Sequence, residues 1–205
     1  MLERAGIPSV QVPILVDTDR FAYRERQETS GVILWAKGLS ERTNPAMAIR
    51  AIAQVQQVEP QARLWLAGDG VLMAAMRQLA STLGAQVDFL GNVSFFDIHR
   101  LYQQASIFWN TSYLDNMPDN VLEASACGLP VIATRVGGVP FIVQDGENAL
   151  LVEANDHDAL ARRTLEVLRD KALARRLGRA ARANAERFGW QALGPRLARI
   201  YNGTT

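Results

Sequence analysis

Residues 106–134 read SIFWNTSYLDNMPDNVLEASACGLPVIAT, and this stretch decides the fold class. It opens on an apolar run at 106–110, passes through a polar loop, and continues at 121–126 with the spacing of a helix. Gly128 can end that helix, because glycine readily adopts the left-handed backbone that often follows one. A second apolar run follows at 131–134. This order predicts two parallel strands joined by a helix.

The same alternation extends in both directions along the chain. Further apolar runs that predict buried strands lie at residues 32–35, 63–67, 86–90 and 149–152. Segments with helical spacing separate them, at residues 45–58, 71–83 and 95–105. The pattern predicts an α/β fold with a doubly wound, mostly parallel sheet. Residues 10–15 are expected to add an edge strand, and residues 17–21 a turn.

The last fifty residues differ, since their pattern is helical throughout. A break is expected at 187–190, before a last helix at 190–201. Between residues 162 and 199 there are ten Arg and one Lys. This excess fits an anionic membrane surface or, alternatively, a solvated helical face. We expect one domain over residues 1–205, with a leading segment at about 1–30, an α/β core at 31–155 and C-terminal helices at 156–205.

Composition excludes several classes of protein. The 205 residues carry 22 Lys or Arg against 21 Asp or Glu, so the net charge of +1 gives no argument for nucleic acid. Cys127 is the only cysteine, which excludes a disulfide framework and a multi-cysteine zinc site. The start lacks the apolar run of a signal peptide, and no apolar run is long enough to span a bilayer. We therefore expect a cytoplasmic protein.

In an open parallel sheet, ligands bind where strands end and helices begin. The turn after residues 32–35 carries Lys37 and Arg42, followed by Asn44 as a helix cap and Pro45 at the first helical position. Two cations beside a helix N-terminus predict a phosphate site. The alternative is that both side chains are simply solvated.

The next turn, Gly68-Asp69-Gly70, resembles the start of a dinucleotide fingerprint. Met73 stands where the third glycine would be, and no acidic residue is evident at the end of the next strand. We therefore interpret these glycines as tight-turn residues. A second glycine pair, Gly137 and Gly138, fits either close approach to a ligand or a simple turn.

The turn after residues 106–110 is the richest in polar groups. Asp115 lies just ahead of the helix, which is expected to begin at Asn116 or Met117, and Glu123 lies about two turns further on. Free N–H groups at the helix start would meet an anion, while the two carboxylates could accept hydrogen bonds from hydroxyls. Hydroxyls beside phosphates describe a nucleotide sugar. Alternatively, Asp115 merely favours the helix dipole, although Glu123 is costly to bury without a partner.

Taken together, these segments resemble the C-terminal, donor-binding half of a GT-B glycosyltransferase of the large retaining family 4 (glycosyl transferases group 1). The resemblance covers nearly the whole chain and rests on the order of its motifs. These are VDTDRF at 16–21, LAGDG at 66–70, FLGNV at 89–93, LEASACGLPVIAT at 122–134, VGGVP at 136–140 and QDGENALLV at 144–152. It implies a Rossmann-like nucleotide-sugar-binding domain.

The resemblance also implies roles for individual residues. Lys37 and Arg42 would bind the diphosphate, and Glu123 would bind the ribose hydroxyls. Asp115 and the backbone of Asn116 and Met117 would contact the donor sugar. The turn from Gly91 to Val93 would face the base. The chain departs from the family in three ways. Asp115 replaces a longer Glu, the Lys and Arg positions are exchanged, and Phe141 stands where Glu is usual.

The family's activity follows as an expectation. It is retaining transfer of a hexose-type sugar from a nucleotide diphosphate to an acceptor such as a polysaccharide or glycolipid, without a metal or other cofactor. Asp115, Lys37 and Arg42 would be the catalytic residues. A GT-B enzyme has two such domains, so the chain is expected to be inactive without an N-terminal half, on the same chain or a separate one. Peripheral contact with the inner face of the membrane fits lipid-linked acceptors. The alternative is a stand-alone nucleotide-sugar-binding or interaction module without catalysis.

Overall fold

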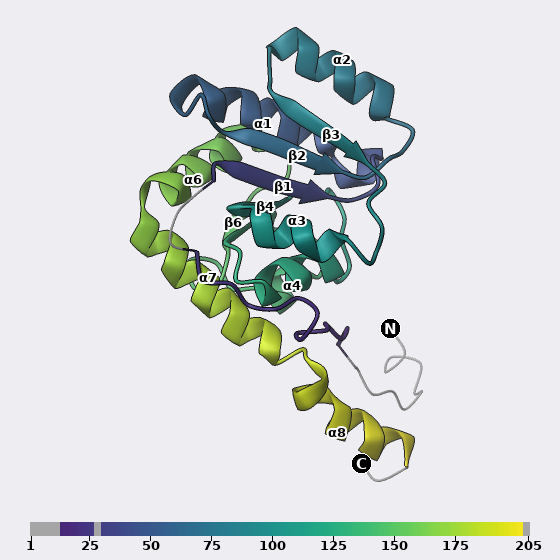
Figure 1. Ribbon diagram of the computed structural model, residues 1–205. Coiled ribbons are helices and arrows are strands. Elements are labelled where there is room, and N and C mark those ends of the chain that lie inside the picture. The colour runs from purple at the N-terminus through teal and green to yellow at the C-terminus, as the bar shows by residue number, and fades with distance from the viewer. Residues whose placement is uncertain (1–12, 27–29, 203–205) are drawn as a thin grey trace.

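The computed structural model describes residues 13–26 and 30–202, which form an α/β fold around a six-stranded sheet (Figure 1). The strands are β1 Val32–Ala36, β2 Arg63–Ala67, β3 Val87–Gly91, β4 Ile107–Asn110, β5 Val131–Thr134 and β6 Leu150–Val152. Their order is β3-β2-β1-β4-β5-β6, and every neighbouring pair is parallel. The doubly wound parallel sheet is thereby confirmed.

The strand order reverses between β1 and β4. From β1 the chain winds outward through β2 to β3, and then returns to the centre at β4 before winding outward through β6. Such a switch point leaves a crevice outside the carboxyl ends of the two central strands. The fold thus places the loops that follow β1 and β4 side by side.

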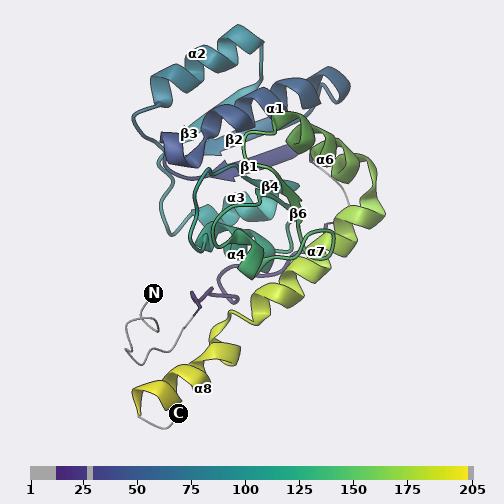
Figure 2. The same cartoon turned by 180° about the vertical axis from the view of Figure 1, so that it is seen from behind.

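Helices cover both faces of the sheet (Figures 1 and 2). They are α1 Pro45–Val58, α2 Met73–Leu83, α3 Ile98–Gln104, α4 Asp119–Ala126, α5 Val139–Ile142, α6 His157–Arg169, α7 Lys171–Glu186 and α8 Trp190–Tyr201, with a 3-10 turn at Glu41–Thr43. Side chains of β1 alternate between the two faces of the sheet. Ile33 and Trp35 pack in the hydrophobic cluster under α1, α2 and α6, and Leu34 packs in the cluster under α3 and α4. All three side chains are fully buried.

Several expected boundaries shift. No strand forms at residues 13–15, and residues 10–12 lie outside the described part. Instead, Val16 makes a single bridge to Gly189. Helix α4 begins at Asp119 with Pro118 as its N-cap, so the expectation of a start at Asn116 or Met117 is wrong. Asn44 caps α1 as expected, with its side chain accepting the N–H of Met47 at 3.3 Å.

Two arginines hold the N-terminal segment against the domain. The Arg26 guanidinium donates to the carbonyls of Tyr102, Ala105 and Cys127 at 2.7–2.9 Å, at the ends of α3 and α4. Carbonyl groups at helix C-termini favour a cation. Burial lowers the pKa of Arg26 to about 10. Arg182 of α7 similarly donates to carbonyls of the N-terminal segment and to Ala126 at 3.0–3.2 Å.

The C-terminal helices confirm the expected break. Helix α7 ends at Glu186 and α8 begins at Trp190. In both views α8 extends away from the sheet (Figures 1 and 2). Within the described part of the chain, no helix is both long and apolar enough to cross a membrane.

Candidate nucleotide-sugar site

A cleft of about 820 Å³ lies at the carboxyl ends of the central strands. Its walls come from the loops after β1, β2, β3 and β4 and from the start of α4. The volume falls in the range usual for small-molecule sites, about 300–1,000 Å³. Six residues assigned to the site from sequence line it: Lys37, Arg42, Val93, Asp115, Met117 and Glu123.

One end of the cleft, here the cation end, is built around an ion pair between Lys37 and Asp115. Both side chains are largely buried, with 16% and 13% of their surface exposed. The Asp115 carboxylate also accepts hydrogen bonds from Asn110 at 3.1 Å and Ser112 at 3.2 Å, and Lys37 contacts the Ser112 hydroxyl at 3.3 Å. A charge taken out of water in this way needs such partners. Arg42 lies exposed on the rim of the same end.

A buried hydroxyl fixes the loop that carries Asp115. Thr111 accepts the indole N–H of Trp35 at 2.8 Å and donates to the carbonyls of Thr43 and Asn44 at 3.0 and 2.9 Å. These bonds connect the loop after β4 to β1 and to the start of α1. The cation end is therefore held from strands on both sides of the switch point.

The glycine pairs let neighbouring loop backbones pack closely together. A Cβ on Gly68 would lie 1.8 Å from the Lys37 carbonyl oxygen, and one on Gly70 would lie 2.3 Å from that of Leu39. A Cβ on Gly138 would lie 1.2 Å from the Asn116 carbonyl oxygen. The Gly138 N–H also donates to the Asp115 carbonyl at 2.8 Å. The two pairs thus support the loops that carry Lys37 and Asp115 respectively.

The other end, here the carboxylate end, holds Glu123 on the second turn of α4. The hydroxyl of the fully buried Tyr102 donates to the Glu123 carboxylate at 2.8 Å. Burial raises the pKa of Glu123, with Asp119 adding to the rise, while the Tyr102 bond and Arg20 oppose it. Burial, reinforced by Glu123, raises the pKa of Tyr102 well above its usual value, so the phenol keeps its proton and donates.

Two residues expected in the site are not part of the cleft lining. Gly91 does not line the cleft, but its carbonyl accepts the Gly68 N–H at 2.7 Å, joining the turns after β3 and β2. Asn116 is covered on its backbone by Gly138 and is also outside the lining. Met117 lines the cleft, and its sulfur accepts the N–H of Ile14 at 3.3 Å.

Sequence reasoning missed three polar partners, namely Tyr102, Asn110 and Ser112. Asn110 and Ser112 stand at the end of β4, where a polar residue after an apolar run is a usable signal. Tyr102 gives no such signal, since an aromatic residue inside a helical pattern is ordinarily core. Among the residues that the structure describes, no group of three or more His, Cys, Asp and Glu side chains is placed to hold a metal ion.

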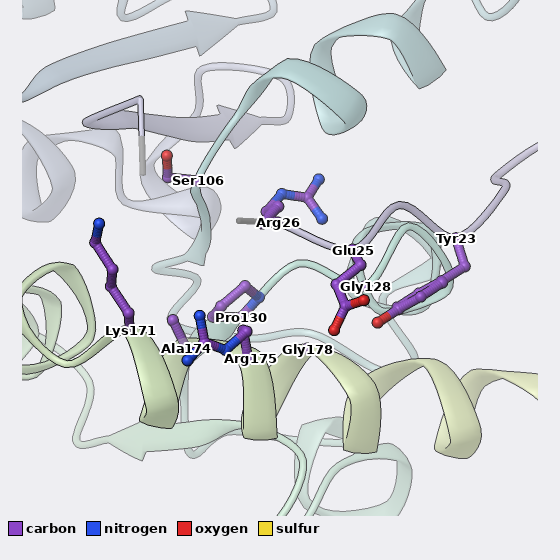
Figure 3. Close-up of a pocket in the computed structure, with 10 residues that line it drawn as sticks. All are labelled: Tyr23, Glu25, Arg26, Ser106, Gly128, Pro130, Lys171, Ala174, Arg175 and Gly178. Atoms are coloured by element: carbon purple, nitrogen blue, oxygen red, sulfur yellow. The ribbon is translucent and has the colours of Figure 1, made fainter. Parts of the chain in front are cut away.

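A second cavity lies elsewhere, between α7 and the N-terminal segment (Figure 3). Lys171 and Arg175 of α7 line it on one side, and Glu25 and Arg26 on the other, as Figure 3 shows. Its volume is about 20 Å³, which is room for about one water molecule. The larger cleft is therefore the candidate site.

The sequence is similar to a known family and to known enzymes. The family profile described as Glycosyl transferases group 1 matches residues 17–184. A GDP-mannose-dependent monoacylated alpha-(1-6)-phosphatidylinositol monomannoside mannosyltransferase of Corynebacterium glutamicum is 32% identical over 193 residues, covering 89% of this chain and 50% of the relative. The chain spans about half the length of the curated relatives it matches.

Solved structures share the fold. Anabaena HepE, in complex with UDP, superposes with a TM-score of 0.83 at 23% identity, over 92% of this chain and 56% of that one. The C-terminal domain of the glycosyl transferase group 1 protein LpcC from Francisella tularensis superposes with a TM-score of 0.76 at 21% identity, over 83% of this chain and 96% of that one. The chain therefore belongs to the glycosyl transferases group 1 family, with the Rossmann-like fold of its C-terminal, GT-B type domain.

Proposed function

We propose that this chain is the donor-binding domain of a retaining family 4 glycosyltransferase, which binds a nucleoside diphosphate hexose in the cleft. The observation that carries the proposal is the pairing of two different carboxylates across the start of α4. Asp115 shares a cation end with Lys37, and Glu123 is held by Tyr102 at the other end. A nucleoside diphosphate sugar carries its diphosphate between the hydroxyls of the sugar and those of the ribose, which matches this arrangement of side chains.

The diphosphate would bind at the cation end. Lys37 and Arg42 supply positive charge, and the start of α4 supplies the positive end of a helix dipole, where Pro118 offers no side-chain cap. A phosphate oxygen would compete with Asp115 for the Lys37 ammonium. Asp115 would then be free to accept hydrogen bonds from hydroxyls of the donor sugar, while Glu123 accepts them from the ribose.

The chemistry at this site would be mainly electrostatic. Breaking the bond between the anomeric carbon and the diphosphate leaves negative charge on the nucleotide. Lys37, Arg42 and the backbone N–H of Met117, which all line the cleft, would stabilise that charge. The acceptor oxygen would bond to the anomeric carbon on the face that the diphosphate leaves, which retains the configuration. The proton of the acceptor hydroxyl would pass to the departing phosphate oxygen. These residues would act without a metal or other cofactor.

The acceptor and its binding surface would come from an N-terminal half. The chain matches about half of its curated relatives, which supports a second domain in the working enzyme. One of those relatives is named for a phosphatidylinositol mannoside, which supports a glycolipid or polysaccharide acceptor. We place such an enzyme in the cytoplasm, in peripheral contact with the inner face of the membrane.

Calorimetric titration of the 205-residue chain with UDP, GDP and ADP tests the proposal. We expect one nucleotide to bind, with at least about tenfold weaker binding in Glu123→Ala and Lys37→Ala, since each removes a charged hydrogen bond. Glu147→Ala is the matched control, because Glu147 is an exposed carboxylate outside the cleft. The titration is repeated with EDTA, which should leave binding unchanged. Absence of binding, both alone and with the N-terminal half added, would contradict the proposal.

A module that binds nucleotide sugars without transferring them is the second candidate. It is favoured by the short reach of Asp115, whose carboxylate is already engaged by Lys37. Sugar transfer measured with the N-terminal half present separates the two candidates. Transfer with an unchanged anomeric configuration, followed by NMR, supports the enzyme. Tight nucleotide binding without transfer supports the module.

A further inference from the structure

An exposed aromatic ring stands at the carboxylate end of the cleft without an evident structural role. Phe95 has 64% of its surface exposed. Among the exposed aromatic residues of the described chain, it alone lines the cleft. Its neighbour Phe96 is 79% exposed and lies outside the lining. Because apolar and aromatic side chains line most small-molecule sites, an exposed ring in the lining of this cleft is available to a ligand.

Two neighbouring side chains contact the Phe95 ring. The guanidinium carbon of Arg20 lies 3.5 Å from the Phe95 ring centroid, as in a cation–π pair. Phe96 meets Phe95 edge-on, with the centroids 5.8 Å apart and the rings at 75°. Arg20 does not line the cleft, so it supports the ring from behind. Phe95 itself lines the cleft and remains largely exposed there.

The loop that carries the ring is itself ordered. The Ser94 hydroxyl accepts the Phe96 N–H at 3.1 Å, and the Ser94 carbonyl accepts the N–H groups of Asp97 and Ile98 at 2.9 and 3.0 Å. These bonds close a turn just before α3. A ring fixed by its backbone and by two side chains loses little further freedom when a ligand covers it.

Arg20 also relates this ring to Glu123. Its charge acts on the Glu123 carboxylate, and it is the only cation among the groups that do so. One terminal nitrogen of Arg20 is buried without a hydrogen-bond partner, so the guanidinium is committed to the aromatic cluster. The Arg20 guanidinium also lies 5.3 Å from the Phe21 ring centroid, and Phe21 meets Tyr102, the hydrogen-bond partner of Glu123, edge-on at 5.8 Å. These contacts bring Phe95 and Glu123 to the same end of the cleft. A ribose whose hydroxyls bind Glu123 would carry its base toward Phe95.

We propose that Phe95, supported by Arg20, is the stacking surface for the nucleobase of the donor. The inference rests on the proposed function. Every base has a π face, so stacking on Phe95 supplies affinity without choosing the base. The choice is left to polar contacts with the turn at Asn92 and Val93, which lines the same part of the cleft.

Titrations of Phe95 variants with UDP, GDP, ADP and inorganic pyrophosphate test the proposal. We expect Phe95→Ala to weaken binding of each bound nucleotide about 5- to 100-fold and to leave pyrophosphate, which has no base, unchanged. Phe95→Leu should lose nearly as much, whereas Phe95→Trp should keep or improve the affinity. Tyr201→Ala is the matched control and should bind like the wild type, because Tyr201 is an exposed aromatic residue outside the cleft.

The possible results separate the stacking proposal from the proposed function. Unchanged nucleotide affinity in Phe95→Ala, together with a loss in Glu123→Ala, overturns the stacking and leaves the proposed function intact. An equal loss for nucleotides and pyrophosphate also overturns it, because the ring would then act on the cleft as a whole. A wild-type chain that binds none of the nucleotides, alone or with the N-terminal half, overturns both proposals. The exposure of Phe95 means that its variants are expected to fold normally.

Discussion

The cation end and the carboxylate end of the cleft each hold one acidic side chain, but they differ in how its negative charge is compensated. Asp115 meets a cation, a hydroxyl and an amide, so its negative charge is compensated within the protein. Glu123 meets one phenol, and burial raises its pKa. The comparison teaches that the two acidic residues of the motif are not equivalent. Asp115 is bound to Lys37, which a phosphate can take over as a partner. Glu123 has no cation bound to it among the described residues and can accept hydrogen bonds from ligand hydroxyls.

The largest effect should come from breaking the support of the cation end. Gly138→Ala places a Cβ where only 1.2 Å separates it from the Asn116 carbonyl oxygen, so the loop carrying Asp115 must move. We expect the free energy of unfolding to fall by about 3 kcal/mol, as for overpacked sites, and nucleotide binding to be lost. Urea denaturation measures the change.

A matched control exists on the other side of the same cleft. A Cβ on Gly38 would lie 3.6 Å from the Asp69 carbonyl oxygen, which is an ordinary contact. Gly38→Ala should therefore change the free energy of unfolding by less than about 1 kcal/mol. Equal losses in the two variants would show that the close approach at Gly138 does not hold the cation end.

The ion pair itself can be separated from ligand binding by a double-mutant cycle. Lys37→Met leaves the Asp115 carboxylate largely buried without its cation, which should cost about 1–3 kcal/mol of unfolding free energy. Adding Asp115→Asn should recover most of that stability, since the amide needs no counter-charge. Nucleotide affinity should stay low in both variants. Additive stability losses, measured by denaturation, would mean that the two side chains do not interact.

The raised pKa of Glu123 should make the free energy of unfolding depend on pH. The raised pKa means that the folded chain binds more protons at Glu123 than the unfolded chain does, between the usual glutamate pKa and the raised one. The stability that this proton contributes is therefore fully present below the usual value and is lost as pH rises through the raised one. A tenfold difference in proton affinity between the folded and unfolded chains corresponds to about 1.4 kcal/mol.

Glu123→Gln tests this effect because it removes the ionisation. The variant should lose less stability than the wild type as pH rises through that window, as followed by urea denaturation at a series of pH values. Glu147→Gln, at an exposed site, should behave like the wild type. A wild-type slope that persists in Glu123→Gln would assign the pH dependence to another group.

The smallest effect is expected from Tyr102→Phe. Loss of the 2.8 Å bond should cost about 1 kcal/mol of unfolding free energy. Because this bond helps to lower the pKa of Glu123, its removal should shift the pH dependence of nucleotide binding upward. Tyr113→Phe, which removes the bond from the Tyr113 hydroxyl to Asn155 at 3.2 Å outside the cleft, should leave that pH dependence unchanged. Titrations at several pH values would contradict the idea if the binding profile of Tyr102→Phe stayed in place.

Local patterns were sufficient for most elements. The alternation of apolar runs with helical spacing predicted β1, β2, β4 and β5 nearly to the residue. Residues 13–15 show where the same reasoning failed, because a short apolar run pairs only if a neighbouring strand offers its edge. Helix α4 starts at Asp119 and not at Asn116 or Met117, since the Asp115 carbonyl accepts the Gly138 N–H and not an N–H of a helical turn.

The sequence predicted only part of the candidate site, namely the residues that follow strands. Lys37 and Asp115 follow strands, and parallel strands bring their carboxyl ends together, so the sequence could place both residues in one cleft. Tyr102 lies on a helix that passes beneath Glu123, and nothing in its local pattern reveals that neighbour. Phe95 is similar, because its exposure is a property of the folded surface.

The sequence by itself determined the α/β class, the family and the positions of the charged loop residues, since side-chain periods and turn residues act over a few positions of the chain. Only the tertiary structure decided what each group faces. It paired Lys37 with Asp115, set Tyr102 under Glu123 and pressed Gly138 against Asn116. Such contacts join residues far apart in the chain, so their energies depend on how the strands and helices pack and not on any local pattern.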